Sequence, residues 1–180
     1  MPPLVFYPAF IGTFISVVAW TYLAYKEHLP HLPRTLSELA AEKAETLRYY
    51  RTILWVCGPL FAVTLYLFIV PRIASSLLAG VIGSFTIIPE LLIGYFPAKR
   101  GKITAHDIIA GTMGAGMITL AYMFAWDLYG LYSLTELVLA IVISALGILC
   151  IANRKRYLFY ELPLIYLPHF SILVAALALK

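Results

Sequence analysis

The chain has 180 residues, of which 62% are hydrophobic and only 12% are charged. A soluble domain keeps about a quarter of its residues charged, so this composition excludes one and predicts a surface that faces lipid. The mean hydropathy of +0.90 also excludes a disordered chain. The net charge of +4 does not indicate a nucleic-acid partner, because the basic residues stand in short groups between long apolar runs.

Six long apolar runs predict an all-α, polytopic integral membrane protein that forms a single domain over residues 1–180. A helix needs about 20 apolar residues to cross the hydrocarbon, and only helices or closed barrels satisfy their backbone groups there. Pro71 and Arg72 alone separate the second and third runs, which predicts an antiparallel pair of neighbouring helices. The predicted spans are Leu4–Tyr25, Thr52–Val70, Ile73–Phe96, Thr104–Trp126, Leu134–Ile151 and Tyr157–Leu179.

The distribution of basic residues predicts how the bundle lies in the membrane. Eleven of the thirteen lysines and arginines fall in the first, third and fifth connections, whereas the fourth connection has none. Cytoplasmic loops carry such an excess. The sequence therefore predicts a protein of the cell membrane with both termini outside. The residues predicted to lie in the cytoplasm are Lys26, Arg34, Lys43, Arg48, Arg51, Lys99, Arg100, Lys102, Arg154, Lys155 and Arg156.

The first connection is long enough to hold a helix of its own. Thr35 and Glu38 have the spacing of a capping box, which predicts a helix start at this point. Apolar residues then recur at helical spacing opposite charged ones, so we expect a cytoplasmic amphipathic helix over residues 36–51. Two interpretations stay open for it: a lid over a cavity, or an interfacial ramp into the second span.

Ionisable side chains inside the predicted spans are the candidates for function, because each costs several kcal/mol there unless it is paired, hydrated or neutral. Helix rise places Glu90 about 10 Å and Glu161 about 7 Å from the predicted cytoplasmic face. Asp107, preceded by His106, opens the fourth span at that face, and His169 lies about 20 Å deep. The hypothesis is one polar cavity in the cytoplasmic leaflet, with candidate catalytic residues Glu90, His106, Asp107 and Glu161.

Small residues in the fourth span favour this cavity. Asp107, Gly111 and Gly114 fall at helical spacing, and such a stripe lets a neighbouring backbone approach closely. We therefore expect Asp107 to point into the bundle, and the same small-residue faces allow a homo-oligomer. For Glu90, Glu161 and His169 the alternative is a purely structural role, with each side chain held by hydroxyls or by freed backbone carbonyls.

Motifs for catalysis of the soluble type are missing from the sequence. It contains no phosphate loop, dinucleotide fingerprint, paired-histidine metalloprotease motif or serine elbow. Cys57 and Cys150 lie inside apolar runs, without a neighbour at metal-ligand spacing, and are predicted to be buried thiols. The sequence thus assigns neither a metal nor a cofactor, and it leaves open whether the protein is an enzyme.

Three short stretches resemble a family of six-helix membrane proteins. These are Thr35–Ala40 followed by the span around Gly58, Gly94–Pro97 followed by Gly101 and His106–Gly111, and Glu161 near the start of the last span. They are similar to elements of the uncharacterised archaeal and bacterial proteins that carry the domain of unknown function 998, a family related to the DRAM and FGF-receptor-activating proteins. The resemblance implies six helices in one bundle, with one face that carries Ser37, Glu38, His106 and Glu161.

Three functions compete at this stage. The first is a lipid-binding or lipid-modifying membrane protein, whose rim of basic residues and His169 would bind membrane lipids beside the polar cavity. Its candidate binding residues are Ser37, Glu38, Lys99, Arg100, Lys102, Arg154, Lys155, Arg156 and His169. The second is a small transporter or channel subunit in which the same acids relay protons or cations. The third is a structural membrane protein without catalysis.

Overall fold

The computed structural model describes residues 6–26, 35–96, 98, 104–152 and 157–179. Every regular element in these ranges is helical. Six of the helices are long and apolar enough to cross a membrane, which confirms the predicted all-α fold of the membrane type. The helices are α1 (Phe6–Lys26), α2 (Leu36–Glu42), α3 (Ala44–Thr64), α4 (Ser76–Ile93), α5 (Ala105–Asp127), α6 (Gly130–Ala152) and α7 (Tyr157–Ala178).

The second span is longer than predicted, because α3 begins at Ala44 and not at Thr52. The first two turns of α3 contain charged residues, so their hydropathy is too low for a membrane span and the start of the helix could not be recognised from it. At its other end α3 continues through a π-helical segment, Leu65–Ile69, and a 3-10 turn, Val70–Arg72. Pro71 lies in that turn and cannot continue the helical ladder, so α4 starts soon afterwards and runs antiparallel, as predicted.

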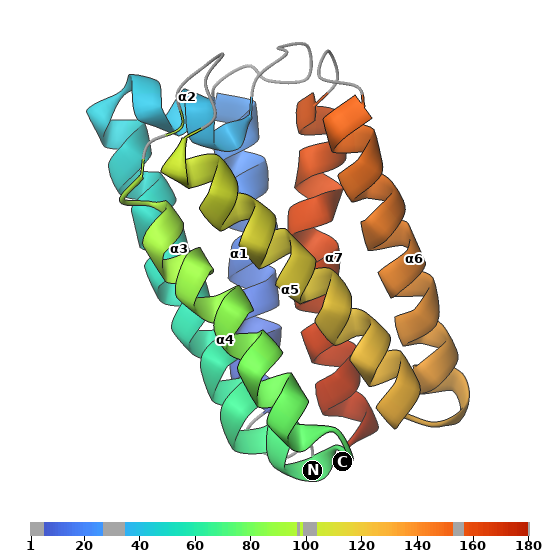
Figure 1. The fold of residues 1–180 in the computed structure, drawn as a ribbon. Helices are drawn as coiled ribbons and strands as arrows, with labels where there is room; N and C mark the ends of the chain where they lie inside the picture. The colour runs from blue at the N-terminus through green and yellow to red at the C-terminus, as the bar shows by residue number, and fades with distance from the viewer. Residues whose placement is uncertain (1–5, 27–34, 97, 99–103, 153–156, 180) are drawn as a thin grey trace.

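The long helices pack around the bundle in a closed order. Helix α1 contacts α3 and α7, α4 contacts α3 and α5, and α6 contacts α5 and α7. Helix α7 also contacts α3 and α5, which places it partly inside the bundle. As Figure 1 shows, α1 begins and α7 ends at the same end of the molecule, whereas α2 lies across the opposite end. Which end faces the cytoplasm stays a prediction from the charges.

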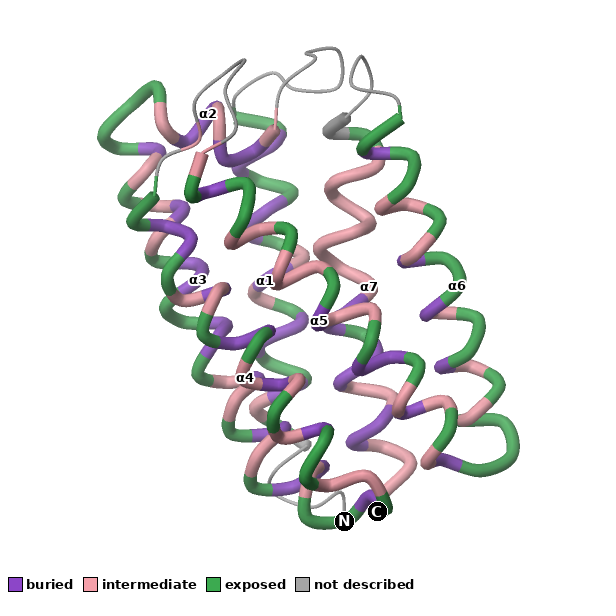
Figure 2. The backbone as a smooth tube through the Cα atoms, in the orientation of Figure 1, coloured by how far each residue is buried: buried purple, intermediate pink, exposed green. Residues whose placement is uncertain are grey.

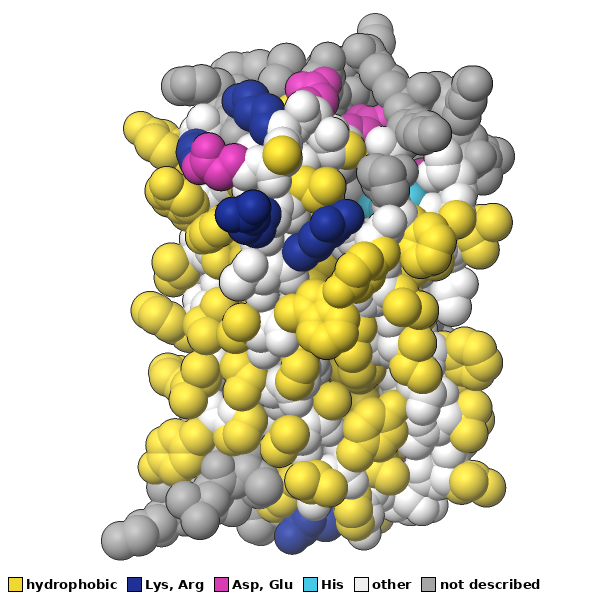
Figure 3. Space-filling model, turned by 90° about the vertical axis from the view of Figure 1, so that its left-hand side faces the viewer, with side chains coloured by type: hydrophobic (Ala, Val, Ile, Leu, Met, Phe, Trp, Pro, Cys, Tyr) yellow, Lys and Arg dark blue, Asp and Glu magenta, His cyan; other side chains and the backbone are white. Residues whose placement is uncertain are grey.

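The sides of the bundle suit a lipid surround. Large apolar side chains point outward, with Leu77 83% and Trp126 88% exposed. Figure 3 shows such side chains over the broad middle of one face, while most of its charged side chains gather toward the α2 end. Buried residues lie along the inward faces of the helices (Figure 2). The core between α3, α5 and α7 includes Phe61, Phe124 and Ile172.

Helix α2 begins where the sequence predicts it. The Thr35 side chain accepts from the Glu38 amide at 3.0 Å and the Glu38 carboxylate accepts from the Thr35 amide at 3.0 Å, so the capping box is present. The helix ends at Glu42, however, because Lys43 adopts an extended conformation. Residues 44–51 belong to α3 and not to an amphipathic helix over residues 36–51. The short helix buries Leu36, Ser37, Leu39 and Ala40.

The glycine of α5 that packs closely against a neighbouring helix is Gly116, and not Gly111 or Gly114 as we expected. A Cβ added at Gly111 or Gly114 would meet no atom within 4 Å, so the prediction that these two glycines pack against a neighbouring helix is wrong within one chain. At Gly116 an added Cβ would lie 2.5 Å from Thr86 Oγ1 and 3.3 Å from the Phe85 carbonyl oxygen. Close approach of α5 to α4 therefore depends on Gly116. Association of copies through the open glycines stays a prediction.

Candidate functional site

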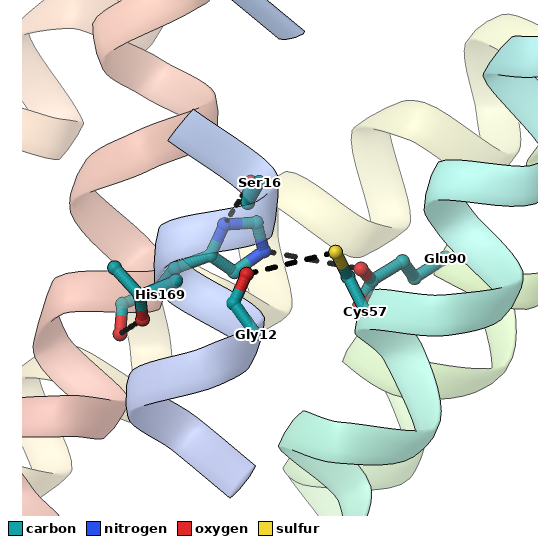
Figure 4. Close-up of polar contacts among 6 residues, drawn as sticks. Gly12, Ser16, Cys57, Glu90 and His169 are labelled. Atoms are coloured by element: carbon teal, nitrogen blue, oxygen red, sulfur yellow. Dashed lines mark hydrogen bonds and ion pairs between the residues drawn. The ribbon is translucent and has the colours of Figure 1, made fainter. Parts of the chain in front are cut away.

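A histidine and a carboxylate meet inside the bundle, one from α7 and one from α4 (Figure 4). His169 Nε2 lies 3.8 Å from Glu90 Oε1, and the two side chains are only 4% and 5% exposed. On the other side of the ring, His169 Nδ1 is 2.9 Å from Ser16 Oγ of α1. Three helices thus hold one imidazole between a hydroxyl and a carboxylate.

A proline stands immediately before each member of this pair, Pro89 in α4 and Pro168 in α7. Proline lacks the N–H that would bond to the carbonyl four residues earlier, so the carbonyls of Phe85 and Leu164 lose their helical partner. Interrupted helices of this kind line the binding sites of many transporters. Both ionisable groups therefore lie where their own helices are locally weakened.

Close packing surrounds the His169 ring and the Glu90 side chain. Phe61 of α3 stacks on the imidazole of His169, with ring centroids 4.2 Å apart and planes 4° from parallel. A Cβ added at Gly58 would come within 2.8 Å of Leu91 Cδ2, so this glycine gives the neighbour of Glu90 in α4 its space against α3. Gly12 has the same function for Phe61, because an added Cβ would come within 3.1 Å of the ring.

The pair has unused hydrogen-bonding capacity. Nε2 of His169 has no hydrogen-bond partner among the described residues. Its distance of 3.8 Å from the Glu90 carboxylate is too long for a direct hydrogen bond, although it is within ion-pair range if the imidazole is protonated. Histidine changes its charge more readily near neutral pH than any other side chain.

Glu161 lies between this pair and the α2 end of the bundle. Its Oε2 accepts a 2.8 Å hydrogen bond from the backbone N–H of Leu36, the first residue of α2. The side chain of Tyr50, 7% exposed, lies close enough to interact electrostatically with both the Glu161 and the Glu90 carboxylates. Glu161, Tyr50 and Glu90 thus lead from α2 toward His169.

The other two predicted catalytic residues serve the start of α5. Asp107 is exposed, and its Oδ2 accepts from the amide and the hydroxyl of Thr104 at 2.6 and 2.8 Å. The prediction that Asp107 points into the bundle is therefore wrong: the carboxylate caps its own helix. His106 is buried, and its Nδ1 lies 2.8 Å from the carbonyl oxygen of Phe96. This contact joins the first turn of α5 to Phe96, which follows the end of α4.

The described residues do not join the four predicted catalytic side chains in one cluster. Glu90 faces His169, Glu161 binds α2, and His106 and Asp107 hold the α5 terminus. No group of three histidine, cysteine or acidic side chains in the described ranges has the geometry to hold a metal ion.

Apart from His169, which faces Glu90, the predicted binding residues fall into two groups. Ser37 and Glu38 lie in α2, where the Ser37 hydroxyl is 2.8 Å from that of Thr35 and Glu38 completes the capping box. The basic residues predicted for the rim lie outside the described residues, namely Lys99, Arg100, Lys102, Arg154, Lys155 and Arg156.

Two residues of the polar interior were missed by sequence reasoning. Ser16 is a single serine within an apolar run, and one serine in such a run does not indicate a polar site. Glu136 was not counted among the ionisable residues of the spans, but it belongs to α6 and is completely buried. Its position within the predicted fifth span, two residues after Leu134, was a signal that could have identified it.

Comparisons of this chain with protein-family models, with curated proteins and with solved structures found no match. The resemblance to the domain of unknown function 998 therefore stays a prediction, and the site itself must carry any functional argument.

Proposed function

We propose that the protein is a proton-translocating integral membrane protein in which Glu90 and His169 bind the transported proton. The observation that carries this proposal is the buried 3.8 Å contact between the two side chains, with a ring nitrogen left without a hydrogen-bond partner among the described residues. An ionisable pair inside a membrane bundle is expensive to keep for packing alone, and such pairs are typical of proton relays.

The proton reaches the pair from the α2 end in this proposal. Glu161 and Tyr50 provide groups that accept or pass a proton on that side of Glu90. Toward the opposite end, α3 and α7 continue with buried apolar residues. Phe61 and Leu65 are both 0% exposed and Ile172 is 4% exposed. The arrangement supports a state in which the site is reached from one side and sealed from the other.

Release on the sealed side requires α3 and α7 to move, and both helices have breaks that favour such a movement. α7 contains Pro163 and Pro168, and α3 contains Pro59 before its π-helical segment. Prolines and π-segments interrupt the regular hydrogen-bond ladder and are common points of bending. We expect the α2 end to face the cytoplasm, as the basic residues predict.

A vesicle experiment tests this proposal. The purified full chain is reconstituted into liposomes that enclose a pH-sensitive dye, and an inside-negative potential is imposed with potassium and valinomycin. Wild-type vesicles are expected to acidify, and Glu90→Gln vesicles to behave like protein-free ones. The matched control is Glu45→Gln, which removes one carboxylate from a surface ion pair with Lys26 and should acidify like wild type. Equal rates for wild type and Glu90→Gln would contradict the proposal.

Lipid binding is the second candidate, because one groove on the side of the bundle favours it. This groove of about 510 Å³ lies between the end of α3 and the start of α4. Its lining is mainly apolar but includes the hydroxyls of Tyr66, Ser76 and Ser84, and Tyr66 and Ser84 are hydrogen-bonded at 2.9 Å. An acyl chain fits such a lining. The groove lies away from the α2 end, so it is not the polar cavity predicted from the sequence.

A further inference from the structure

A second buried carboxylate lies between α6 and α7. Glu136 is 0% exposed, and its Oε2 accepts a 2.6 Å hydrogen bond from the Ser171 hydroxyl. Its other oxygen, Oε1, has no hydrogen-bond partner among the described residues. The backbone N–H of Ala175 also lies near the carboxyl group. One oxygen of a fully buried acid is thus left over.

Nothing charged in the described surroundings balances this group. One and two turns along α6, Ala140 and Ile143 form a small apolar cluster with Ala121 of α5. None of the ion pairs between described residues includes Glu136.

The titratable groups on the two helices packed against α6 are directed elsewhere. On α7, His169 faces α1 and α4, Tyr166 bonds to Thr21, and Glu161 bonds to Leu36. On α5, His106 and Asp107 hold the helix start, Asp127 bonds to Ser75, and Tyr122 is exposed.

We propose that Glu136 and Ser171 form a second proton-binding site, in which Glu136 is held as a neutral carboxylic acid. Helix rise places Glu136 about 9 Å from the start of α6, inside the apolar part of the bundle. An ionised carboxylate there, without a compensating charge, would cost several kcal/mol, and binding a proton removes that cost. A metal ion is a poor alternative, because hard cations take about six oxygen ligands and the described residues offer few.

This site is separate from the Glu90–His169 pair. Ser171 follows His169 by two residues, which corresponds to about 200° around α7 and about 3 Å along it. His169 therefore faces α1 and α4, whereas Ser171 faces α6, with the backbone of α7 between them. The proposal for Glu136 does not rest on the proposed function, and the two can fail independently.

Covalent labelling tests the second site in the wild-type chain. A neutral carboxylic acid adds across a C=N bond of a lipid-soluble carbodiimide: its oxygen bonds to the central carbon and its proton moves to a nitrogen, so nothing is lost. The adduct rearranges to a stable N-acylurea, which mass spectrometry locates on a peptide. With dicyclohexylcarbodiimide and the reconstituted protein, we expect labelling of Glu136 at neutral pH and loss of labelling at strongly alkaline pH.

Controls separate this result from its alternatives. Glu136→Gln should lose the label and the infrared carbonyl band of a protonated carboxylic acid, while Glu90→Gln should retain both at residue 136. Ser171→Ala keeps the carboxyl and should still be labelled, so the test does not depend on the folding of one variant. An unlabelled Glu136 in wild type, together with an infrared spectrum that Glu136→Gln leaves unchanged, would overturn the proposal. Protection by sodium but not by potassium at equal ionic strength would overturn it too, in favour of a sodium site.

Discussion

We expect replacement of either Glu90 or His169 to lower the free energy of unfolding by about 3–5 kcal/mol, the cost of removing one partner of a buried ion pair, because a protonated His169 would pair with the Glu90 carboxylate. The suitable variants are Glu90→Gln, which keeps the shape of the side chain, and His169→Phe, which keeps a ring to stack on Phe61. The measurement is denaturant unfolding of the purified protein in detergent. Because the two side chains face each other at 3.8 Å, their effects should not be additive.

The double variant measures that coupling. With both groups replaced, no charge is left without its partner, so the combined loss should be smaller than the sum of the single losses by about 0.5–3 kcal/mol. Glu45→Gln is the control for loss of a surface carboxylate and should stay within about 1 kcal/mol of wild type, because Glu45 is 83% exposed. Single variants that each cost less than about 1 kcal/mol, with additive effects, would show that the pair is not a unit.

The second large effect is expected at Glu161, which fastens α2 to α7. Replacement by alanine removes the acceptor that the Leu36 amide uses at 2.8 Å. Leaving a buried backbone donor without its acceptor costs about 1–3 kcal/mol, so local opening of α2 should become about 5- to 150-fold more frequent. Hydrogen exchange of the amides in Leu36–Glu42, read by mass spectrometry, measures this change.

Two comparisons make the result at Glu161 specific. Glu161→Gln retains a neutral acceptor and should accelerate the exchange less than Glu161→Ala. The amides of α6 do not depend on this contact and should exchange as in wild type. Unchanged exchange of α2 in Glu161→Ala would mean that its capping box and buried apolar residues hold the helix without Glu161, and the connection between α2 and the polar interior would lose its support.

The number and order of the helices could be predicted because each depends on a pattern within one segment. The lengths of the apolar runs predicted six spans, and Pro71 predicted the turn between the second and third. The Thr35–Glu38 spacing predicted the start of α2. Helix ends near charged residues were harder. A charged helical turn that continues an apolar helix has the same composition as a separate surface helix, which is why α3 starts earlier than predicted.

The partners of the ionisable side chains could not be predicted, because depth along a helix says nothing about direction. Glu90 and Asp107 were placed near the same face by depth, yet one points inward to His169 and the other caps its own helix. Each residue turns the helix by about 100°, so groups at the same depth on two helices can point in opposite directions. The contact between His169 and Ser16 joins segments more than 150 residues apart, so the residues around either one do not indicate it.

The glycines illustrate the same limit. Gly111, Gly114 and Gly116 lie within two turns of one helix, and only the last has a neighbour that an added Cβ would touch. A stripe of small residues thus predicts that close approach is possible, while the tilt of the neighbouring helix decides where it takes place.

The proposed function requires that Glu90 and His169 bind a proton that exchanges with solvent. Nitrogen-15 NMR of the reconstituted protein with labelled histidines tests it most directly, and the His169 signal is the one that disappears in His169→Phe. We expect this signal to move between its neutral and protonated positions as the pH changes, and to do so over a different pH range in Glu90→Gln. A His169 signal that does not respond to pH, or that responds identically in wild type and Glu90→Gln, would contradict the account.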